Sequence, residues 1–210
     1  MLSREVLQRN WGHLLAVAAN IVTFALLFRP WLTVDGVDGK ARANAFGRIQ
    51  ATTSYMGAWS KPSPFTASIS GTWAVLASAA IVVLVTAVAL DLRLRSRALS
   101  RVATVSALAA AVFVLLVMWH LDSRAPQLYE MTARTWDVGG QIGSWIQWAT
   151  NDGDLVLPGA RFSAPYSTTT FTPAALTATT TSLAAAVVTA AQCWISRRGE
   201  IAAAASDSRG

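Results

Sequence analysis

Few side chains in this sequence are of types and spacings that could do chemistry. The candidates are the histidines His13 and His120, the cysteine Cys193, and the carboxylate pairs Asp35 with Asp38 and Glu130 with Asp137. Paired carboxylates can perform general acid–base catalysis, but Asp35 and Asp38 each stand one residue before a glycine, which is typical of tight turns. The sequence contains no Ser-His-Asp, Cys-His, phosphate-binding or zinc-binding spacing. We therefore expect no catalytic residues and no cofactor, and we predict that the protein is not an enzyme.

Two arrangements could be mistaken for metal sites. The segment 151–154 (Asn-Asp-Gly-Asp) lacks the spaced oxygen ligands and the terminal glutamate of an EF-hand. His13 and His120 stand near opposite ends of two apolar segments, which as membrane helices would separate them by about 25 Å. We expect no bound metal ion.

The elements that would carry these residues are long apolar segments. The chain has 210 residues, of which 53% are hydrophobic and 13% charged, whereas a soluble domain carries about 25% charged residues. Four stretches contain no Asp, Glu, Lys or Arg: 11–28, 72–90, 102–121 and 174–195. Each has the ~17–25 residues that a helix needs to cross a bilayer, and lipid requires backbone groups to be satisfied within the segment. The sequence thus predicts an all-α transmembrane protein with a four-helix membrane bundle.

The distribution of basic residues predicts the orientation. Nine of the 17 Lys and Arg residues fall in the short segments 1–10, 91–101 and 196–210, and eight are spread over the long loops 29–71 and 122–173. The positive-inside rule then places the N- and C-termini in the cytoplasm, for a multi-pass protein of the plasma (inner) membrane. The net charge of +6 is accounted for as an orientation signal, so we expect no nucleic-acid partner. We also predict that the tail 196–210 is disordered.

The first apolar segment could be read as a signal peptide, because Arg4 and Arg9 precede it. Its 18 residues exceed the usual ~7–15 of such a segment, and no small-residue cleavage site follows it. We therefore predict a retained helix. Tryptophans mark the predicted helix ends, as in an aromatic belt: Trp11 and Trp194 on the cytoplasmic side, Trp73 and Trp119 on the external side.

Small residues recur along two of the predicted helices. One row has a spacing of four: Ala174, Ala178, Ser182, Ala186 and Ala190; the other row is Ala103, Ala107 and Ala111. Such rows let membrane helices approach closely, either within this bundle or against a helix of another protein. Asn20, midway along the first segment, is expected to form an interhelical hydrogen bond.

The two long loops are predicted to fold together outside the membrane as a small mixed α/β cap. In the first, Pro30–Val34 resembles a strand and Ala45–Ile49 a return strand, separated by Asp-Gly turns. In the second, an amphipathic helix is predicted at about 137–150, which could lie on the other loop, the outer leaflet or a partner. The residues expected to form extracytoplasmic contacts are Trp31, Trp59, Trp136, Ile142, Trp145 and Trp148.

Four spans, internal termini, two folded outer loops and Trp31 just after the first span resemble the claudin-type tetraspan plan. The resemblance is one of architecture, because the Trp-Gly-Leu-Trp motif and paired cysteines of that family are missing. Arg outnumbers Lys 15 to 2 in an Ala-rich chain, a bias typical of high-GC genomes, and in this the chain resembles small four-helix envelope proteins of actinobacteria. Some of these resemble accessory subunits of lipid-import or respiratory assemblies.

These observations favour a non-catalytic accessory or scaffold subunit of a plasma-membrane complex, with membrane lipids and other integral membrane subunits as partners. One alternative is a small transporter or lipid-handling component, which would need a polar cavity around Asn20 and the Thr179–Ser182 cluster. A second alternative is a membrane-embedded enzyme. Transporters coupled to ions generally hold an ionisable group in the membrane, and the four predicted spans contain no Asp, Glu, Lys or Arg.

Overall fold

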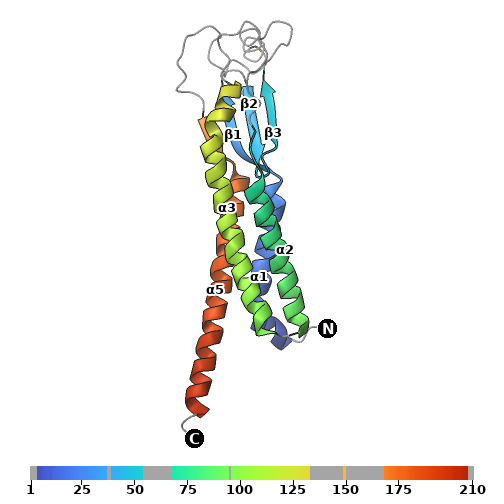
Figure 1. Ribbon diagram of the computed structural model, residues 1–210, viewed down its shortest axis with the longest axis vertical. Coiled ribbons are helices and arrows are strands. Elements are labelled where there is room, and N and C mark those ends of the chain that lie inside the picture. The colour runs from blue at the N-terminus through green and yellow to red at the C-terminus, as the bar shows by residue number, and fades with distance from the viewer. Residues whose placement is uncertain are drawn as a thin grey trace. The chain divides into compact units, whose positions relative to one another are not determined.

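The computed structural model describes residues 4–36, 39–53, 68–94, 96–132, 149 and 168–207. In this part of the chain the elements are α1 (Arg4–Leu27), β1 (Pro30–Gly36), β2 (Gly39–Asn44), β3 (Ile49–Thr53), α2 (Thr72–Leu94), α3 (Arg97–Thr132), β4 (Thr168–Phe171) and α5 (Pro173–Asp207) (Figure 1). The chain divides into two compact units. The first contains Met1–Leu26, Thr72–Leu116 and Thr177–Gly210, and the second contains Leu27–Gly71 and Val117–Leu176.

Three of the helices are long and apolar enough to cross a membrane. These stretches are Thr72–Leu94, Ala98–Tyr129 and Pro173–Ile195, and α1 contributes a shorter apolar stretch, Trp11–Leu27. The protein is therefore a helical membrane protein, as the sequence predicts. A four-stranded sheet accompanies the helices, and its strands come from the two long loops.

All four helices extend beyond the predicted spans: α1 begins at Arg4, α2 ends at Leu94, and α3 and α5 extend furthest. α3 covers Arg97–Thr132 instead of 102–121, and α5 continues to Asp207 through a segment for which we predicted a disordered tail. In α3 the extension is amphipathic: Leu121, Leu128 and Thr132 are buried while Asp122 is exposed. A search for uninterrupted apolar stretches stops at the first charged residue, whereas the helix continues as long as one face is buried.

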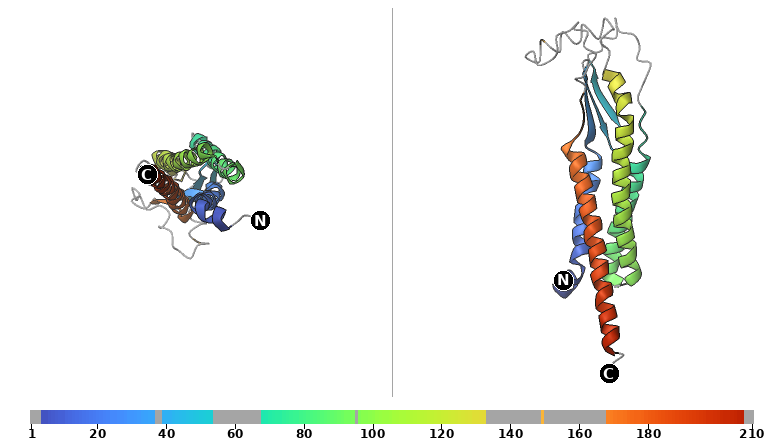
Figure 2. Two further views of the ribbon diagram at one scale, coloured as in Figure 1. Left: turned by 90° about the horizontal axis from the view of Figure 1, so that it is seen from below. Right: turned by 90° about the vertical axis from the view of Figure 1, so that its left-hand side faces the viewer.

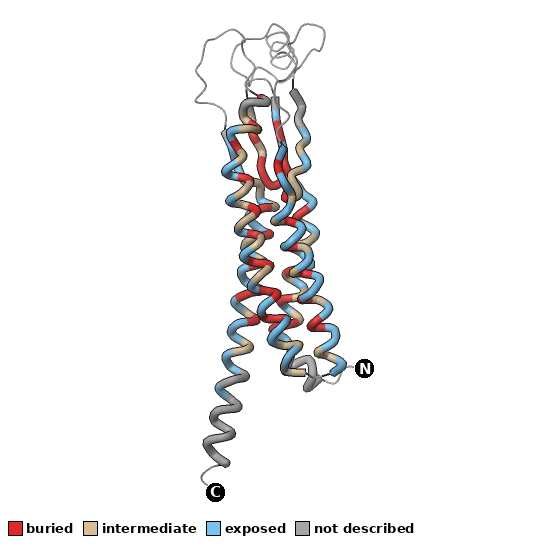
Figure 3. Tube along the Cα trace, in the orientation of Figure 1, coloured by how far each residue is buried: buried red, intermediate tan, exposed pale blue. Residues whose placement is uncertain are grey.

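The first unit is a bundle of α1, α2, the N-terminal part of α3 and most of α5. Its described core includes Leu84, Ala87 and Val88 of α2 with Ala103 and Ala107 of α3, and side chains of α1 pack against this cluster. Buried positions recur along each helix in Figure 3. Trp73 at the start of α2 lies beside Phe113 of α3, with ring centroids 6.3 Å apart.

The second unit contains the sheet, whose strand order is β3-β2-β1-β4 with every neighbouring pair antiparallel. β1 and β2 form a hairpin, and β4, from the second long loop, pairs with β1 from the first. The predicted return strand Ala45–Ile49 is wrong. β2 ends at Asn44, and residues 45–48 form the turn into β3.

This turn has a local cause in the sequence. The Asn44 Oδ1 atom accepts hydrogen bonds from the backbone N–H groups of Phe46 and Arg48, at 3.1 and 2.9 Å. Gly47 adopts a φ of +78°, which other residues rarely accept. An asparagine that bonds to the backbone two residues on, followed by a glycine with positive φ, is a turn signal stronger than the apolar residues Ala45 and Phe46.

The sheet has one buried and one polar face. Alternate residues Leu32, Val34, Ala41 and Ala43 are fully buried. The C-terminal part of α3 lies alongside the sheet in the views of Figures 1 and 2. Residues paired across the strands on the opposite face are polar: Thr170, Thr33, Arg42 and Gln50 in one row, and Asp35 and Lys40 in the next.

Trp31 is predicted as an external contact residue, but its side chain is fully buried. The register of β1 against β2 shifts between Pro30 and Leu32, which is the irregularity of a β-bulge. A bulge allows consecutive residues to face the same side, so Trp31 and Leu32 are both buried. Trp31 therefore belongs to the core of the second unit. Its backbone C=O accepts a hydrogen bond from the N–H of Thr172, just before α5, at 2.9 Å.

Candidate functional site

The most developed arrangement among the described residues is the contact between α1 and α5 in the first unit. Thr23 of α1 lies near Ala178 and Thr181 of α5, while Gly12 of α1 lies near Val188 and Gln192. The order of these contacts is reversed between the two helices, so α1 and α5 run antiparallel. α1 therefore accompanies α5 over most of its apolar stretch.

Gly12 allows the close approach at one end of this contact. A Cβ atom on Gly12 would collide with the Gln192 side chain and would lie 3.2 Å from the Val188 Cγ1 atom. Small residues permit membrane helices to pack closely and gain dispersion energy that lipid does not provide. We did not single out Gly12 from the sequence, because a lone glycine among apolar residues carries no spacing signal.

At the other end of the contact, hydroxyl groups join the helices. The Thr23 and Thr181 Oγ1 atoms are 2.8 Å apart, and Thr23 also approaches the Ala178 carbonyl at 3.4 Å. Thr23 is fully buried. The interhelical hydrogen bond expected of Asn20 is thus formed one turn later, by Thr23.

Asn20 itself is fully buried, and its Nδ2 atom donates to the Ala16 carbonyl of the same helix at 2.9 Å. Its Oδ1 atom accepts no hydrogen bond from the described residues. A buried, unsatisfied acceptor destabilises a protein by about 1–3 kcal/mol. The structure therefore differs from the expected role of Asn20 as an interhelical clamp.

The predicted small-residue row of α5 follows the buried face only in its middle. Ala178, Ser182 and Ala186 are buried, Ala174 is half-buried and Ala190 is exposed. A spacing of four residues advances 400° around a helix of 3.6 residues per turn, so the row drifts about 40° per step. The face that stays buried alternates steps of three and four: Ala175, Ala178, Ser182, Ala185 and Thr189.

On α3 the predicted row lies on the buried face throughout. Ala103, Ala107 and Ala111 are all buried, and Ala110 and Val114 extend the same face. Because Ala110 lies beside Ala111, the buried face of α3 remains lined by small residues even as a spacing of four moves around the helix. The small residues of α3 therefore pack within this chain.

The structure also brings together a serine and a histidine that are 87 positions apart. The Nε2 atom of His13 is 3.1 Å from the Oγ atom of Ser100, and His13 is 3% exposed. A nucleophile and a base can interact at this distance, but the Nδ1 atom of His13 has no hydrogen-bond partner among the described residues. The bond joins the first half of α1 to the start of α3. Sequence spacing alone could not have indicated it.

The hydroxyls of the cluster on α5 are hydrogen-bonded within the helix. Thr180 and Thr181 donate to the Thr177 carbonyl at 3.0 and 2.8 Å, and Ser182 donates to the Thr179 carbonyl at 2.9 Å. Such bonds satisfy hydroxyls in an apolar environment without a ligand. They account for the polar residues of the fourth predicted span in structural terms.

The four tryptophans of the predicted belt all lie in described helices. Trp11, Trp119 and Trp194 are 57, 66 and 56% exposed, whereas Trp73 is half-buried. The Arg198 guanidinium lies 3.7 Å from the centre of the Trp194 ring, a cation–π arrangement. Trp11, Trp73 and Trp194 lie at or next to the ends of the apolar stretches Trp11–Leu27, Thr72–Leu94 and Pro173–Ile195, as at a bilayer interface, whereas Trp119 lies inside Ala98–Tyr129.

Several predicted contact residues fall outside the described residues. These are Trp59, Trp136, Ile142, Trp145 and Trp148, with the amphipathic helix predicted at 137–150 apart from residue 149. Within the described ranges, no group of three or more His, Cys, Asp or Glu residues is placed to hold a metal ion.

Fold and helix contacts together define the class: a helical membrane protein with a small antiparallel sheet whose strands alternate with the helices along the sequence. Comparison with known proteins adds no closer assignment, because no protein-family model and no curated protein sequence matches the chain.

Proposed function

We propose that the chain is a non-catalytic accessory or scaffold subunit of a membrane protein complex, and that α5 is the helix that docks to another subunit. In this proposal α1 is the fourth span, both termini are cytoplasmic and the sheet lies outside the plasma membrane. An envelope lipid-transport or respiratory assembly of the kind found in actinobacteria is a suitable setting.

The observation that carries the proposal is the exposed face of α5. Steps of three and four residues connect exposed positions of small volume: Thr177, Thr180, Ala184 and Ala191, with Val187 between the last two. Leu176 and Leu183, beside this row, are exposed as well. The Thr180 hydroxyl is already bonded to the Thr177 carbonyl, so it needs no water. Small residues at this spacing allow another helix to approach closely.

The exposed face of α3 has a different composition. Val105, Leu108, Val112 and Leu115 are between 43 and 64% exposed, and they are all large aliphatic residues. Such side chains are suited to contact with acyl chains. Exposure to lipid therefore does not by itself explain the small residues of α5.

The length of α5 supports the same proposal. Its apolar stretch ends at Ile195, and the helix continues to Asp207. In the first unit, this end of α5 extends past the ends of the other helices (Figures 1 and 2). Isolated helical segments shorter than about 12–15 residues are marginally stable in water, so a partner would stabilise this end.

The test is purification of the full chain from its native membranes in a mild detergent. We expect the wild-type protein to elute as an assembly larger than a single chain in a micelle. Ala184→Leu should reduce the co-purifying subunit at least about tenfold, because the added volume prevents close helix approach. The matched control Val112→Leu, on α3, should leave the assembly unchanged.

Two results would contradict the proposal. One is a wild-type protein that is monodisperse and alone at all detergent concentrations. The other is equal co-purification with Ala184→Leu and with Val112→Leu, in proteins of equal thermal stability.

A further inference from the structure

The second unit carries an unusual distribution of charge along its sheet. The end of the sheet that is joined to the helices is defined by the chain: α1 ends at Leu27 and β1 begins at Pro30, while β4 ends at Phe171 and α5 begins at Pro173. Pro30 pairs with Asn44, so the β2–β3 turn at 45–48 lies at this same end. We call it the helix-proximal end.

Aromatic and backbone contacts hold the turn at the helix-proximal end. The ring of Phe46 lies 4.9 Å from the ring of Phe28, the residue after α1, and Phe28 is 56% exposed. Gly71, directly before α2, approaches so closely that a Cβ atom there would be 2.5 Å from the Phe46 carbonyl oxygen. The Thr172 hydroxyl donates to the Pro30 carbonyl at 2.5 Å. The residues next to the ends of α1 and α2 therefore contact this turn, and the residue before α5 is bonded to the start of β1 at the same end of the sheet.

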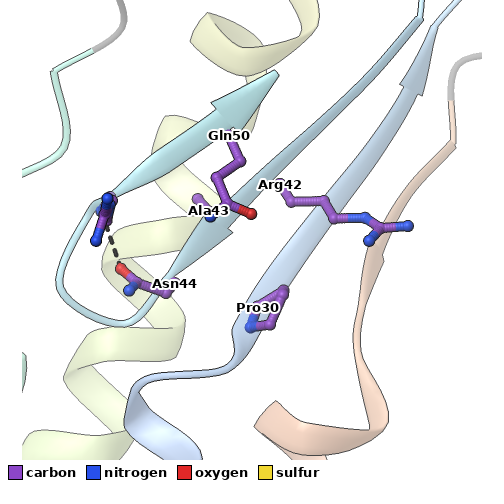
Figure 4. Close-up of a pocket in the computed structure, with 6 residues that line it drawn as sticks. Pro30, Arg42, Ala43, Asn44 and Gln50 are labelled. Carbon is purple, nitrogen blue, oxygen red and sulfur yellow. Dashed lines mark hydrogen bonds between the residues drawn. The ribbon is translucent and has the colours of Figure 1, made fainter. Parts of the chain in front are cut away.

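Three exposed arginines lie at or near this end: Arg29 precedes β1, Arg48 lies in the β2–β3 turn, and Arg42 stands in β2, two residues before the strand ends. Arg42 and Arg48 line a shallow hollow of about 40 Å³ together with Pro30, Ala43, Asn44 and Gln50. Figure 4 shows Arg42, Asn44 and Gln50 on one side of the sheet.

Opposite charge is present at the other end of the hairpin. Lys40 and Asp35 form an ion pair of 3.3 Å, and the register places them next to the β1–β2 turn. This is the one ion pair among the described residues, so the three arginines of the helix-proximal end have no carboxylate partner within that part of the chain. Among the described residues, the arginines near the helix-proximal end therefore have no ion-pair partner, whereas Lys40 near the opposite end of the hairpin is paired with Asp35.

We propose that the helix-proximal end of the sheet binds the phosphate groups of anionic phospholipids. An apolar helix places its ends at the headgroup level of a bilayer, and long arginine side chains reach that level with their stems on apolar surface. A guanidinium donates paired hydrogen bonds to phosphate oxygens, and the Gln50 amide offers a further donor in the hollow. Phe28 and Phe46 supply an apolar body beneath the charges, adjacent to acyl chains.

This inference goes beyond the proposed function, because it requires no protein partner. An external arginine beside a span is unusual, because basic residues next to the spans of membrane proteins accumulate in the cytoplasm. In the proposed topology Arg29 follows the first span directly on the external side. A binding role for its charge explains that placement.

The experiment measures lipid binding to the full chain, purified and delipidated in a neutral detergent, by native mass spectrometry. Phosphatidylglycerol, with one net negative charge, is compared with zwitterionic phosphatidylcholine of the same acyl chains. We expect phosphatidylglycerol to bind about tenfold more tightly or better, since each basic residue near a membrane surface adds several-fold to the affinity for anionic lipid. The double variant R42Q/R48Q should lose this preference.

Matched variants keep the proposal falsifiable. Lys40→Gln removes one positive charge from the far end of the same hairpin and should leave the preference unchanged. R42K/R48K keeps the charge without the paired hydrogen bonds and should give an intermediate affinity. If the double glutamine variant fails to fold, the single variants Arg42→Gln and Arg48→Gln should each weaken binding several-fold.

Inorganic phosphate separates a lipid headgroup from a free anion. At the concentration of lipid that half-saturates the protein, inorganic phosphate should not displace phosphatidylglycerol. Displacement at that concentration would assign the site to a soluble anion and overturn the lipid assignment. The proposal is also overturned if the two lipids bind equally, if R42Q/R48Q binds phosphatidylglycerol like the wild type, or if Lys40→Gln causes the same loss.

Discussion

The inner and outer faces of α5 both contain small residues but have different surroundings, and the outer face also carries the exposed Leu183 and Val187. The inner face, with Ala178, Ser182 and Thr189, is buried within the bundle, and α1 packs there through Thr23. The outer face, with Thr180 and Ala184, is exposed. The inner small residues are explained by packing within the chain, whereas the outer ones have no partner in the part of the chain that the structure describes.

α3 shows what a helix without this second face looks like. Its inner face is also small, with Ala103 and Ala107 fully buried, but its outer face carries Val105 and Val112. Small residues therefore lie where two helices contact each other, and large aliphatic residues lie where a helix contacts acyl chains. By this criterion the exposed row of Thr180, Ala184 and Ala191 is a second helix-packing face of α5, next to the exposed Leu183 and Val187, whereas α3 has one such face.

The largest expected effect on thermal stability comes from enlarging a residue on the inner face of α5. The same enlargement on the outer face serves as its comparison. Ser182→Leu places a larger side chain at a fully buried position, and such overpacking costs about 1–3 kcal/mol. For a chain of this size that lowers the melting temperature by roughly 2–12 °C. Ala184→Leu, two residues away on the exposed face, should leave the melting temperature of the purified chain within about 1 °C. Thermal unfolding in detergent is the measurement. Equal losses for the two variants would remove the distinction between the faces.

A smaller effect is expected from the hydroxyl pair that joins the inner face to α1. Thr23→Val keeps the shape of the side chain but removes the bond to Thr181, and interhelical hydrogen bonds in membranes contribute about 0.6–1.7 kcal/mol. The free energy of unfolding should fall by that amount, as measured by denaturant titration in mixed micelles.

The control for this variant is Thr86→Val on α2. The exposed Thr86 hydroxyl bonds only to carbonyls of its own helix, those of Val82 and Val83, so its removal should change the unfolding free energy little. If Thr86→Val costs as much as Thr23→Val, the cost reflects the loss of a hydroxyl in general and the contact between α1 and α5 is weaker than we infer.

The smallest expected effect, and one of opposite sign, concerns Asn20. Its buried Oδ1 atom accepts no hydrogen bond from the described residues, so Asn20→Leu removes an unsatisfied acceptor at similar volume. The melting temperature should stay constant or rise by a few degrees. A clear fall would show that Asn20 is bound to a group that stabilises it, as the clamp predicted from the sequence requires.

Composition and apolar length were sufficient to predict the helices, because a membrane restricts spanning segments to few solutions. The strand at Pro30–Val34 was predictable from its turn signals and lies within β1. β2 was missed, because its alternation of Lys, Ala, Arg, Ala and Asn has no large apolar residue to reveal it, although Ala41 and Ala43 are fully buried.

Helix contacts were less predictable than helices. Rows of small residues indicated the right helices, but a spacing of four could not separate the buried face of α5 from the exposed Ala190. Gly12, Thr23 and the pair of His13 with Ser100 depend on residues brought together over long sequence distances. A single sequence contains no periodic signal for such contacts.

The most direct test of the central claim is photo-crosslinking in native membranes, with a photoreactive residue placed at Val187 of α5 or at Val112 of α3. These positions are 67 and 53% exposed, so both have access to whatever surrounds the bundle. We expect Val187 to yield one discrete adduct with another protein, and Val112 to yield lipid adducts alone. A protein adduct from neither position, or the same protein adducts from both, would contradict the assignment of the outer face of α5 to a partner helix.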